Sequence, residues 1–326
     1  MATRADDLID RRRLRRKLTF WRVAAVVVLV IALVVGSSAL MGDGPWTPAS
    51  GAHVARISVE GTIVEDEELL ERIERVRKSD AVKGVILTVD SPGGTTVGGE
   101  AIFEAVRALA EEKPVVAQVG TLAASAGYMI ASAADHIVAR QSSIVGSIGV
   151  LVQFPDVTGL MDKIGVELVE IKSSPLKAEP SPFNETTPAE RAMMRAMILD
   201  SYDWFVDLVT DRRPLSRDEV LALADGSIFT GRQAAERRLV DALGGEKTAR
   251  AWLTEQGVDA DLKVVEWKPR DRGGVTLVPG FLAAAAARLL GLPQDGPQLL
   301  RALGAERIFL DGLLSVWQPE NGGEID

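Results

Sequence analysis

Short apolar runs alternate with amphipathic segments along the middle of the chain, and this alternation constrains the fold more than any other feature. The run KGVILTV at 83–89 is typical of a strand buried in a parallel sheet. Segment 65–78 instead places its apolar residues on one face at helical spacing. These repeats predict an α/β fold with a mainly parallel sheet and flanking helices. Strands are expected at 53–59, 83–89, 114–119, 137–139 and 166–171, and helices at 65–78, 98–112 and 124–134.

The second half of the chain has a mostly helical pattern. Residues 188–213 read as one long amphipathic helix. Two apolar stretches near the C-terminus, 279–293 and 308–317, also predict amphipathic helices. Such helices suit a membrane surface or a partner subunit, although ordinary core packing is the simplest single explanation.

The N-terminus has the pattern of a membrane anchor. Seven Arg and Lys residues between 11 and 22 precede the uncharged apolar run 23–41. A run of about 20 apolar residues matches the thickness of a bilayer core, and the basic residues favour a cytoplasmic N-terminus. The alternatives are a cleaved signal peptide and a buried core helix. The Gly- and Pro-rich residues 42–52 then predict a linker.

Composition excludes several kinds of function. The formal net charge of −9 argues against a general nucleic-acid-binding protein. The chain has no cysteine, which excludes disulfides, thiolate zinc sites and a cysteine nucleophile. With only two histidines, His53 and His136, a histidine-based metal cage is not expected.

The sequence DSPGG at 90–94 ends a predicted buried strand. Paired glycines let a backbone approach a ligand closely, and their N–H groups can stabilise an anion or an oxyanion. The carboxyl edge of a parallel sheet is also where open α/β folds bind ligands. A plain turn between a strand and a helix explains the same residues, so DSPGG alone is weak evidence.

Ser125 carries the single hydroxyl in the small, apolar stretch AASAG. A serine between a strand and a helix is most often a helix cap. However, small neighbours also allow a bulky acyl group to come close, and the Ala126 N–H would lie beside the hydroxyl. Ser125 is therefore either a cap or a nucleophile.

A nucleophilic serine needs a base. His53 begins a strand directly after the linker, and His136 lies at a junction between a helix and a strand, so both are poor candidates. The alternative is a lysine made neutral by burial, which must lower its pKa from about 10.4. Lys177 lies in the polar loop 173–191 that follows the strand expected at 166–171, and Lys172 is a near neighbour; most lysines in such loops are solvated.

Five stretches, in this order, resemble the signal peptide peptidase A (SppA) family of membrane-anchored serine–lysine proteases, which have the Clp protease/crotonase scaffold. They are VILTVDSPGG (85–94), AASAGY (123–128), DHIVARQSSIVGSIGV (135–150), SSPLKAEPSPFNETTPAER (173–191) and GSIFTGRQAAERRLVDALGG (226–245). Together they span nearly all of residues 52–250. The motifs occur once, so the chain resembles the short form of the family.

The resemblance implies the role of each site residue. Ser125 matches the nucleophile, Lys177 the general base, and Ser147 the serine that holds the lysine by a hydrogen bond. The oxyanion donors would be the N–H groups of Ala126 and of either Gly93 or Gly94. The chain departs from the family at Ala126, which replaces a glycine, and around Lys177, at Pro175, Leu176, Ala178, Glu179 and Asn184. Lys177 is therefore a looser match than Ser125.

The resemblance also implies a setting and a substrate. No metal or cofactor is needed, and the substrates would be remnant signal peptides in a membrane. Members of the short form are rings in which the serine of one subunit meets the lysine of the next. We expect a cytoplasmic segment at 1–22, an anchor at 23–41, a linker at 42–52, a peptidase domain at 53–250 and a C-terminal extension at 251–326. The membrane would be the bacterial inner membrane, with the peptidase domain in the periplasm.

Three rival hypotheses remain on the sequence alone. A crotonase-like acyl-CoA enzyme would use the same oxyanion donors, but the predicted anchor argues against it. An inactive membrane-tethered scaffold is opposed by the presence of Ser125, Ser147 and Lys177. A related membrane protease with regulated protein substrates is compatible with every residue.

Overall fold

The computed structural model describes residues 21–22, 51–269 and 314–316 of the 326-residue chain. The chain divides into two units, 1–50 and 51–326, and the description below concerns the second. The predicted anchor at 23–41 and the predicted helix at 279–293 lie outside the described residues. Among the helices that the structure describes, none combines the length and apolarity needed to cross a bilayer.

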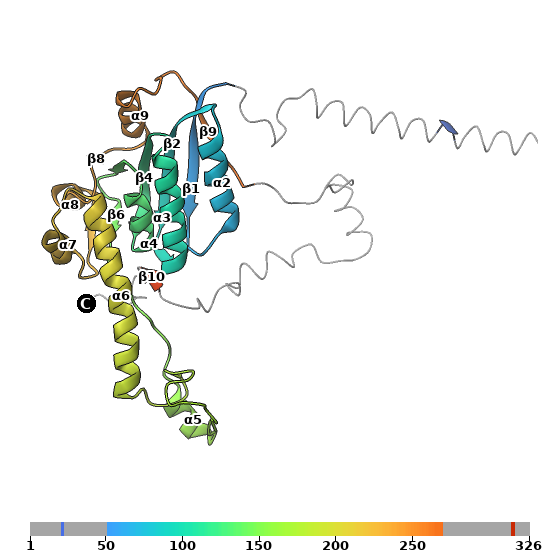
Figure 1. Ribbon diagram of the computed structural model, residues 1–326, viewed down its shortest axis with the longest axis vertical. Coiled ribbons are helices and arrows are strands. Elements are labelled where there is room, and N and C mark those ends of the chain that lie inside the picture. Colours follow the sequence, from blue (N-terminus) through green and yellow to red (C-terminus); the bar gives the residue numbers. More distant parts are fainter. Residues whose placement is uncertain (1–20, 23–50, 270–313, 317–326) are drawn as a thin grey trace, which may run out of the picture. The chain divides into compact units, whose positions relative to one another are not determined.

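An eight-stranded mixed sheet forms the centre of the second unit (Figure 1). Its main path has the order β7-β6-β4-β2-β1-β9, while β5 pairs with β4 and β8. All pairs are parallel except β6–β7. The strands are β1 (His53–Glu60), β2 (Val82–Ser91), β4 (Val115–Ala124), β5 (His136–Ala139), β6 (Ile144–Gly146), β7 (Ile228–Thr230), β8 (Ala242–Leu243) and β9 (Val264–Glu266). A separate two-stranded sheet joins β3 (Gly93–Thr95) to β10 (Leu314–Val316).

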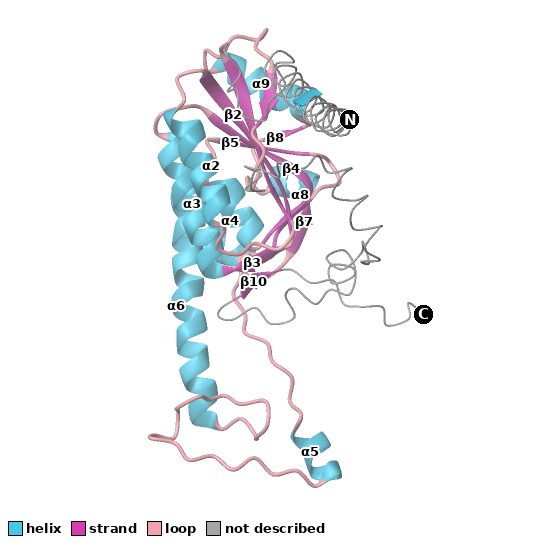
Figure 2. Ribbon diagram, turned by 90° about the vertical axis from the view of Figure 1, so that its right-hand side faces the viewer, coloured by secondary structure: helices cyan, strands magenta, loops and turns pink. Residues whose placement is uncertain are grey.

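Helices cover one face of the main sheet, as Figure 2 shows for α2, α3, α4 and α6. Alternate residues of β1, β2 and β4 point to this face and form the main core with those helices. Ile57 of β1 has no exposed surface there, and burying such a side chain contributes about 1.5–3 kcal/mol. A smaller core under α9 covers part of the opposite face. The helices are α2 (Glu67–Lys78), α3 (Thr96–Ala110), α4 (Ala126–Ser132), α5 (Thr158–Ile164), α6 (Pro188–Arg212), α7 (Arg217–Leu223), α8 (Gly231–Glu236) and α9 (Glu246–Glu255).

Residues 151–201, here called the arm, extend beyond the sheet and its helices. The arm contains α5, the loop 165–187 and the N-terminal part of α6 (Figures 1 and 2). Apart from Glu190, the buried residues of α6 all lie near its C-terminal end, at Phe205, Val206, Leu208 and Val209. The rest of this long helix therefore leaves the core of its own chain.

Most of the predicted elements are confirmed, with small shifts at their ends. The predicted strand at 166–171 is wrong, because these residues form an exposed loop of the arm in which Ile171 is 100% exposed. Helix α4 begins at Ala126 rather than at 124, because β4 continues through Ala124. The predicted helix at 308–317 is wrong at 314–316, which form strand β10.

Candidate active site

Three parallel strands bring the candidate residues to one edge of the sheet. In the pairing of β2 with β4, Ser91 lies opposite Ala123, and in the pairing of β4 with β6, Ala124 lies opposite Gly146. Ser125 and Ser147 each follow the last residue of their strand. The glycines of DSPGG, Ser125 and Ser147 therefore gather where parallel strands end, which is the usual ligand-binding edge.

Ser125 lies on a strained turn between β4 and α4. Its φ of 57° and ψ of −121° are unusual for a residue with a side chain. The main chain is held by hydrogen bonds from the Ser125 N–H to the Gly146 carbonyl (2.8 Å) and from the Met129 N–H to the Ser125 carbonyl (3.0 Å). The side chain is 1% exposed and makes no capping hydrogen bond to α4. Ser125 thus occupies the cap position without acting as the cap, and backbone strain of this kind clusters at functional sites.

Ser147 has a similar backbone directly beside this turn. Its φ is 52°, and its N–H donates to the Ser227 carbonyl at 2.7 Å. Gly146, before it, has a φ of 108°, and a Cβ there would lie 2.9 Å from the same carbonyl. Because Gly146 pairs with Ala124, the two serines extend from neighbouring strand ends.

The two glycines of DSPGG direct their N–H groups differently. The Gly93 N–H donates to the Ser91 hydroxyl at 3.0 Å. On one side of β3, the Ile63 N–H donates to the Gly93 carbonyl and the Thr95 N–H to the Ile63 carbonyl, both at 2.9 Å. Because the main-chain groups of successive strand residues alternate in direction, the Gly94 N–H and carbonyl point away from Ile63. The Gly94 N–H is therefore the one directed to the opposite side of β3.

Close packing explains why the residues around Ser125 are small. A Cβ on Gly127 would lie 2.8 Å from the Ser91 carbonyl, so α4 packs directly against the end of β2. A Cβ on Gly99 of α3 would lie 3.1 Å from the Cβ of Ala126. Ala126 itself is fully buried at the first position of α4. Its N–H therefore lies next to Ser125 in a part of the fold where larger side chains have no room.

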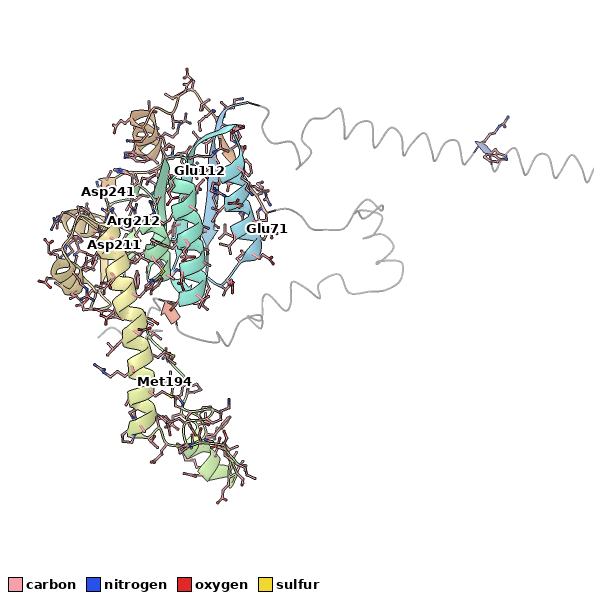
Figure 3. The ribbon with its side chains drawn as sticks, in the orientation of Figure 1. Glu71, Glu112, Met194, Asp211, Arg212 and Asp241 are labelled. Atoms are coloured by element: carbon pink, nitrogen blue, oxygen red, sulfur yellow. The ribbon has the colours of Figure 1, made fainter. Side chains whose placement is uncertain are left out.

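The structure does not bring Lys177 to Ser125 within one chain. Lys177 is exposed in the loop between α5 and α6, and its N–H donates to the Ser174 carbonyl at 3.2 Å. Both views place this loop at the end of the arm, whereas α4 lies against the main sheet (Figures 1 and 2). In Figure 3, Met194 of α6 marks the stretch of the arm that separates the two regions. A single chain therefore holds the serine and the lysine in separate places.

Lys172, the other candidate base, has two acidic partners in the same loop. Its ammonium pairs with Glu170 at 2.7 Å and with Glu179. Hydrogen bonds to Glu170 and Glu179 raise the pKa of Lys172 above its ordinary value. The Asn184 amide also donates to Glu179 at 3.0 Å. These contacts favour the charged form of Lys172, which argues against a role as the base, and they tie together the loop that carries Lys177.

Both histidines have structural partners away from the serines. His53 donates from Nδ1 to the Gly51 carbonyl at 2.9 Å and accepts from Trp267 at 3.1 Å. His136 stacks on Trp252, with ring centroids 5.1 Å apart, and burial lowers its pKa. Within the described part of the chain, no group of His, Asp and Glu side chains is arranged to hold a metal ion.

Sequence reasoning assigned no role to Ser91. Its side chain is fully buried, donates to the Gly61 carbonyl at 2.7 Å and accepts from the Gly93 N–H. The hydroxyl therefore fixes the turn that orients Gly94. The available signal was a polar residue at the end of a buried strand, directly before Pro-Gly-Gly.

Comparisons with known proteins show which family the chain is similar to. Residues 107–261 match the model of peptidase family S49, and residues 55–145 match that of Clp protease. A protein of Synechocystis sp., provisionally named a protease, is 38% identical over 220 residues, which cover 67% of this chain and 79% of the relative. An Enterococcus faecium protein, provisionally named signal peptide peptidase SppA, is 31% identical over 72% of each chain.

A longer relative shows the same similarity over part of its length. Protease 4 of Haemophilus influenzae is 33% identical over 278 residues, covering 79% of this chain and 45% of the relative. The matched families and these relatives agree on a serine peptidase with a Clp protease-like α/β fold. The chain therefore belongs to the signal peptide peptidase A family, within peptidase family S49.

Proposed function

We propose that this serine peptidase cleaves remnant signal peptides in a membrane, with Ser125 as the nucleophile and Lys177 of a neighbouring subunit as the general base. The observation that carries the proposal is the strained turn at Ser125, which lies beside Ser147 and close to the end of β2. A serine on a sharp turn between a strand and a helix is the arrangement by which α/β hydrolases expose their nucleophile.

The reaction follows from these groups. Neutral Lys177 accepts the proton of the Ser125 hydroxyl, and Oγ attacks the carbonyl carbon of the substrate. The resulting oxyanion accepts hydrogen bonds from the N–H groups of Ala126 and Gly94. Lys177 then protonates the leaving amine as the peptide bond breaks, and a water molecule hydrolyses the acyl-enzyme. Ser147 positions the lysine by a hydrogen bond.

Gly94 is the better oxyanion donor of the two glycines. The Gly93 N–H is engaged by the Ser91 hydroxyl, and its carbonyl accepts from Ile63. The Gly94 N–H points to the other side of β3, which is free of Ile63. Gly93 has a structural role instead, because its φ of 105° permits the turn that leads from β2 into β3.

The arm supports a site completed by a second copy of the chain. Large apolar side chains are exposed along it, and a patch of this kind marks an interface. They are Leu151, Phe154, Leu160, Ile164, Val166, Leu168, Val169, Ile171, Leu176, Phe183, Met197 and Leu199. A neighbour that covers this surface would bury Lys177, and burial favours the neutral form of a lysine. A head-to-tail contact of this type closes into a ring when its rotation permits.

Membrane attachment is proposed from the sequence. The basic segment 1–22 and the apolar run 23–41 would anchor the chain in the inner membrane with its N-terminus in the cytoplasm. The peptidase domain would then face the periplasm, on the side where signal peptides remain after export. Enzyme and substrate would share one bilayer.

The test is cleavage of an apolar signal peptide by the full chain in detergent. We expect Ser125→Ala and Lys177→Ala each to lower kcat by at least about 1000-fold, as in other enzymes whose nucleophile and base act together. Lys163→Ala, an exposed lysine on the same arm, is the matched control and should retain activity. A fluorophosphonate should label wild type at Ser125 only. Activity that survives Ser125→Ala would refute the mechanism and favour an acyl-CoA enzyme or a scaffold.

Cleavage of folded proteins in preference to signal peptides would refute the proposed substrate class only. The comparison therefore includes an apolar signal peptide and a soluble protein substrate at equal concentrations. We expect a higher kcat/KM for the signal peptide.

A further inference from the structure

The loop that carries Lys177 lies far from the packed interior of its own chain. Among the described residues, neither hydrophobic core includes one from the arm. Lys177 and most of its neighbours between α5 and α6 are exposed. The less exposed members of this loop include Lys172, Glu179 and Asn184. Contacts within the loop itself must therefore determine where Lys177 lies.

Lys177 belongs to a tight turn that ends at Glu179. The Lys177 N–H donates to the Ser174 carbonyl at 3.2 Å, and the Glu179 N–H donates to the Leu176 carbonyl at 3.4 Å. Ala178, between them, has a left-handed backbone with a φ of 63°. A residue with a side chain persists in this conformation only where its surroundings hold it. The turn therefore needs an anchor close to Glu179.

The carboxylate of Glu179 provides that anchor. Its side chain is 2% exposed, and one oxygen, Oε1, accepts from both the Lys172 ammonium and the Asn184 amide. These contacts join positions before and after Lys177 in the sequence. Hydrogen bonds between ionised groups are among the strongest in proteins. We call Lys172, Glu179 and Asn184 the clamp.

The clamp also accounts for part of the loose match between this loop and the family pattern. Glu179 and Asn184 are two of the positions at which the chain departs from that pattern. The structure places the two side chains in contact, with the Asn184 amide 3.0 Å from Glu179. The two departures therefore form one local unit together with Lys172.

We propose that the clamp positions Lys177, so that its amine reaches the serine of the neighbouring subunit in one fixed place. The proposal rests on the proposed function, in which Lys177 is the general base. The clamp residues are positioning residues, since they act through Lys177 and not on the substrate. Displacing a catalytic group by about 1 Å can lower a rate by about 100-fold. Loss of the clamp should therefore lower kcat and leave KM nearly unchanged.

Two substitutions of Lys172 in the full chain separate a clamp from a base. Lys172→Met keeps an unbranched stem but leaves Glu170 and Glu179 without their cation, and we expect kcat to fall by roughly 10-fold or more. Lys172→Arg keeps the charge and the donors and should restore most of kcat, although arginine cannot act as a base. Lys163→Met, at an exposed lysine of α5, is the matched control and should keep the wild-type kcat. Equal losses in the Lys172→Met and Lys172→Arg variants, or a wild-type kcat in Lys172→Met, would overturn the proposal.

Limited trypsin digestion measures the order of the loop without any peptidase activity. Trypsin cleaves after lysine, and the rate of cleavage after Lys177 reports how often this exposed loop opens. The three chains compared carry Ser125→Ala, which removes the proposed self-cleavage. We expect the fragment that ends at Lys177 to form several-fold faster when Lys172→Met is added than when Lys172→Arg or no further change is made. Equal rates in all three chains would overturn the clamp.

The two measurements separate failure of this proposal from failure of the proposed function. If the wild-type chain cleaves no peptide, the proposed function fails and the catalytic part of this proposal fails with it. Digestion then still decides whether the clamp orders the loop. If wild type is active, and Lys172→Met speeds digestion but keeps the wild-type kcat, the positioning role is overturned and the proposed function stands.

Discussion

The hydroxyl of Ser91 links the fold to the proposed chemistry, so Ser91→Ala is a sensitive test of the account. The group is fully buried, accepts from the Gly93 N–H at 3.0 Å and donates to the Gly61 carbonyl at 2.7 Å. Alanine fits the same space but leaves the buried Gly93 N–H without this acceptor. Gly61 is exposed, so water can replace its lost donor.

The expected loss of stability follows from one unsatisfied buried donor, which costs about 1–3 kcal/mol. The activity should fall further than stability alone explains, because the turn that directs the Gly94 N–H loses its anchor. Complete loss of an oxyanion donor costs about 100-fold or more in kcat. A displaced donor retains part of its effect, so we expect kcat to fall by roughly 10-fold, with a small change in KM.

Urea denaturation and peptide kinetics measure both effects. Ser132→Ala is the matched control, because Ser132 is also buried but its hydroxyl only donates to the Met129 carbonyl within α4. The control should lose about 1 kcal/mol or less and keep the wild-type kcat. A Ser91→Ala enzyme with wild-type kcat would refute the assignment of Gly94 as a donor fixed by this turn.

Three further variants test separate parts of the structure. Gly94→Ala should lower the free energy of unfolding by at least about 3 kcal/mol and abolish peptidase activity, because the new Cβ would collide with the Ile63 carbonyl. A urea denaturation curve close to that of wild type would contradict this. Lys172→Arg should retain most activity, because arginine keeps the pairs with Glu170 and Glu179 but cannot act as a base; complete loss would identify Lys172 as the base. Arg213→Ala should destabilise the fold by about 3–5 kcal/mol near pH 7, measured by urea denaturation between pH 3 and pH 7.

The pH dependence of that last variant follows from Asp241, which lies 2.7 Å from the Arg213 guanidinium. Burial raises the pKa of the Asp241 carboxyl, but the hydrogen bonds and charge of Arg213 outweigh it, and the pKa lies below its ordinary value. A lowered carboxyl pKa stabilises the fold fully above about pH 4, and this stabilisation is lost as the pH falls further. The deficit of Arg213→Ala should therefore shrink below pH 4. A deficit independent of pH would contradict the pairing.

The apolar pattern of the sequence predicted correctly the segments that are buried in the core of their own chain. The runs that became β1, β2 and β4 alternate with helices of clear periodicity, so the α/β class followed from the sequence. The run VELVEI at 166–171 has the same apolar character, yet it lies exposed on the arm. Apolar residues indicate that a surface is buried but not which chain buries it. For the same reason, the expected helix at 308–317 gave no sign of a strand that pairs with β3.

Sequence motifs named the residues that gather at the edge of the sheet, but they did not predict the geometry of these residues. Ser125, Ser147 and the two glycines could be named from their motifs, and the strand pairing explains why they meet. The left-handed backbone at Ser125 depends on hydrogen bonds to β6 and α4, which no local pattern encodes. The choice between Gly93 and Gly94 likewise depended on the contacts of Ile63 and Ser91.

The measurement that tests the central claim most directly mixes two inactive proteins. Ser125→Ala and Lys177→Ala subunits are combined in equal amounts, dissociated, reassembled and assayed on an apolar peptide. If each site takes its serine from one subunit and its lysine from the next, about a quarter of the sites in random assemblies are intact. The account therefore predicts about 25% of wild-type activity from two inactive parents. A mixture as inactive as its parents would contradict a serine–lysine site shared between subunits.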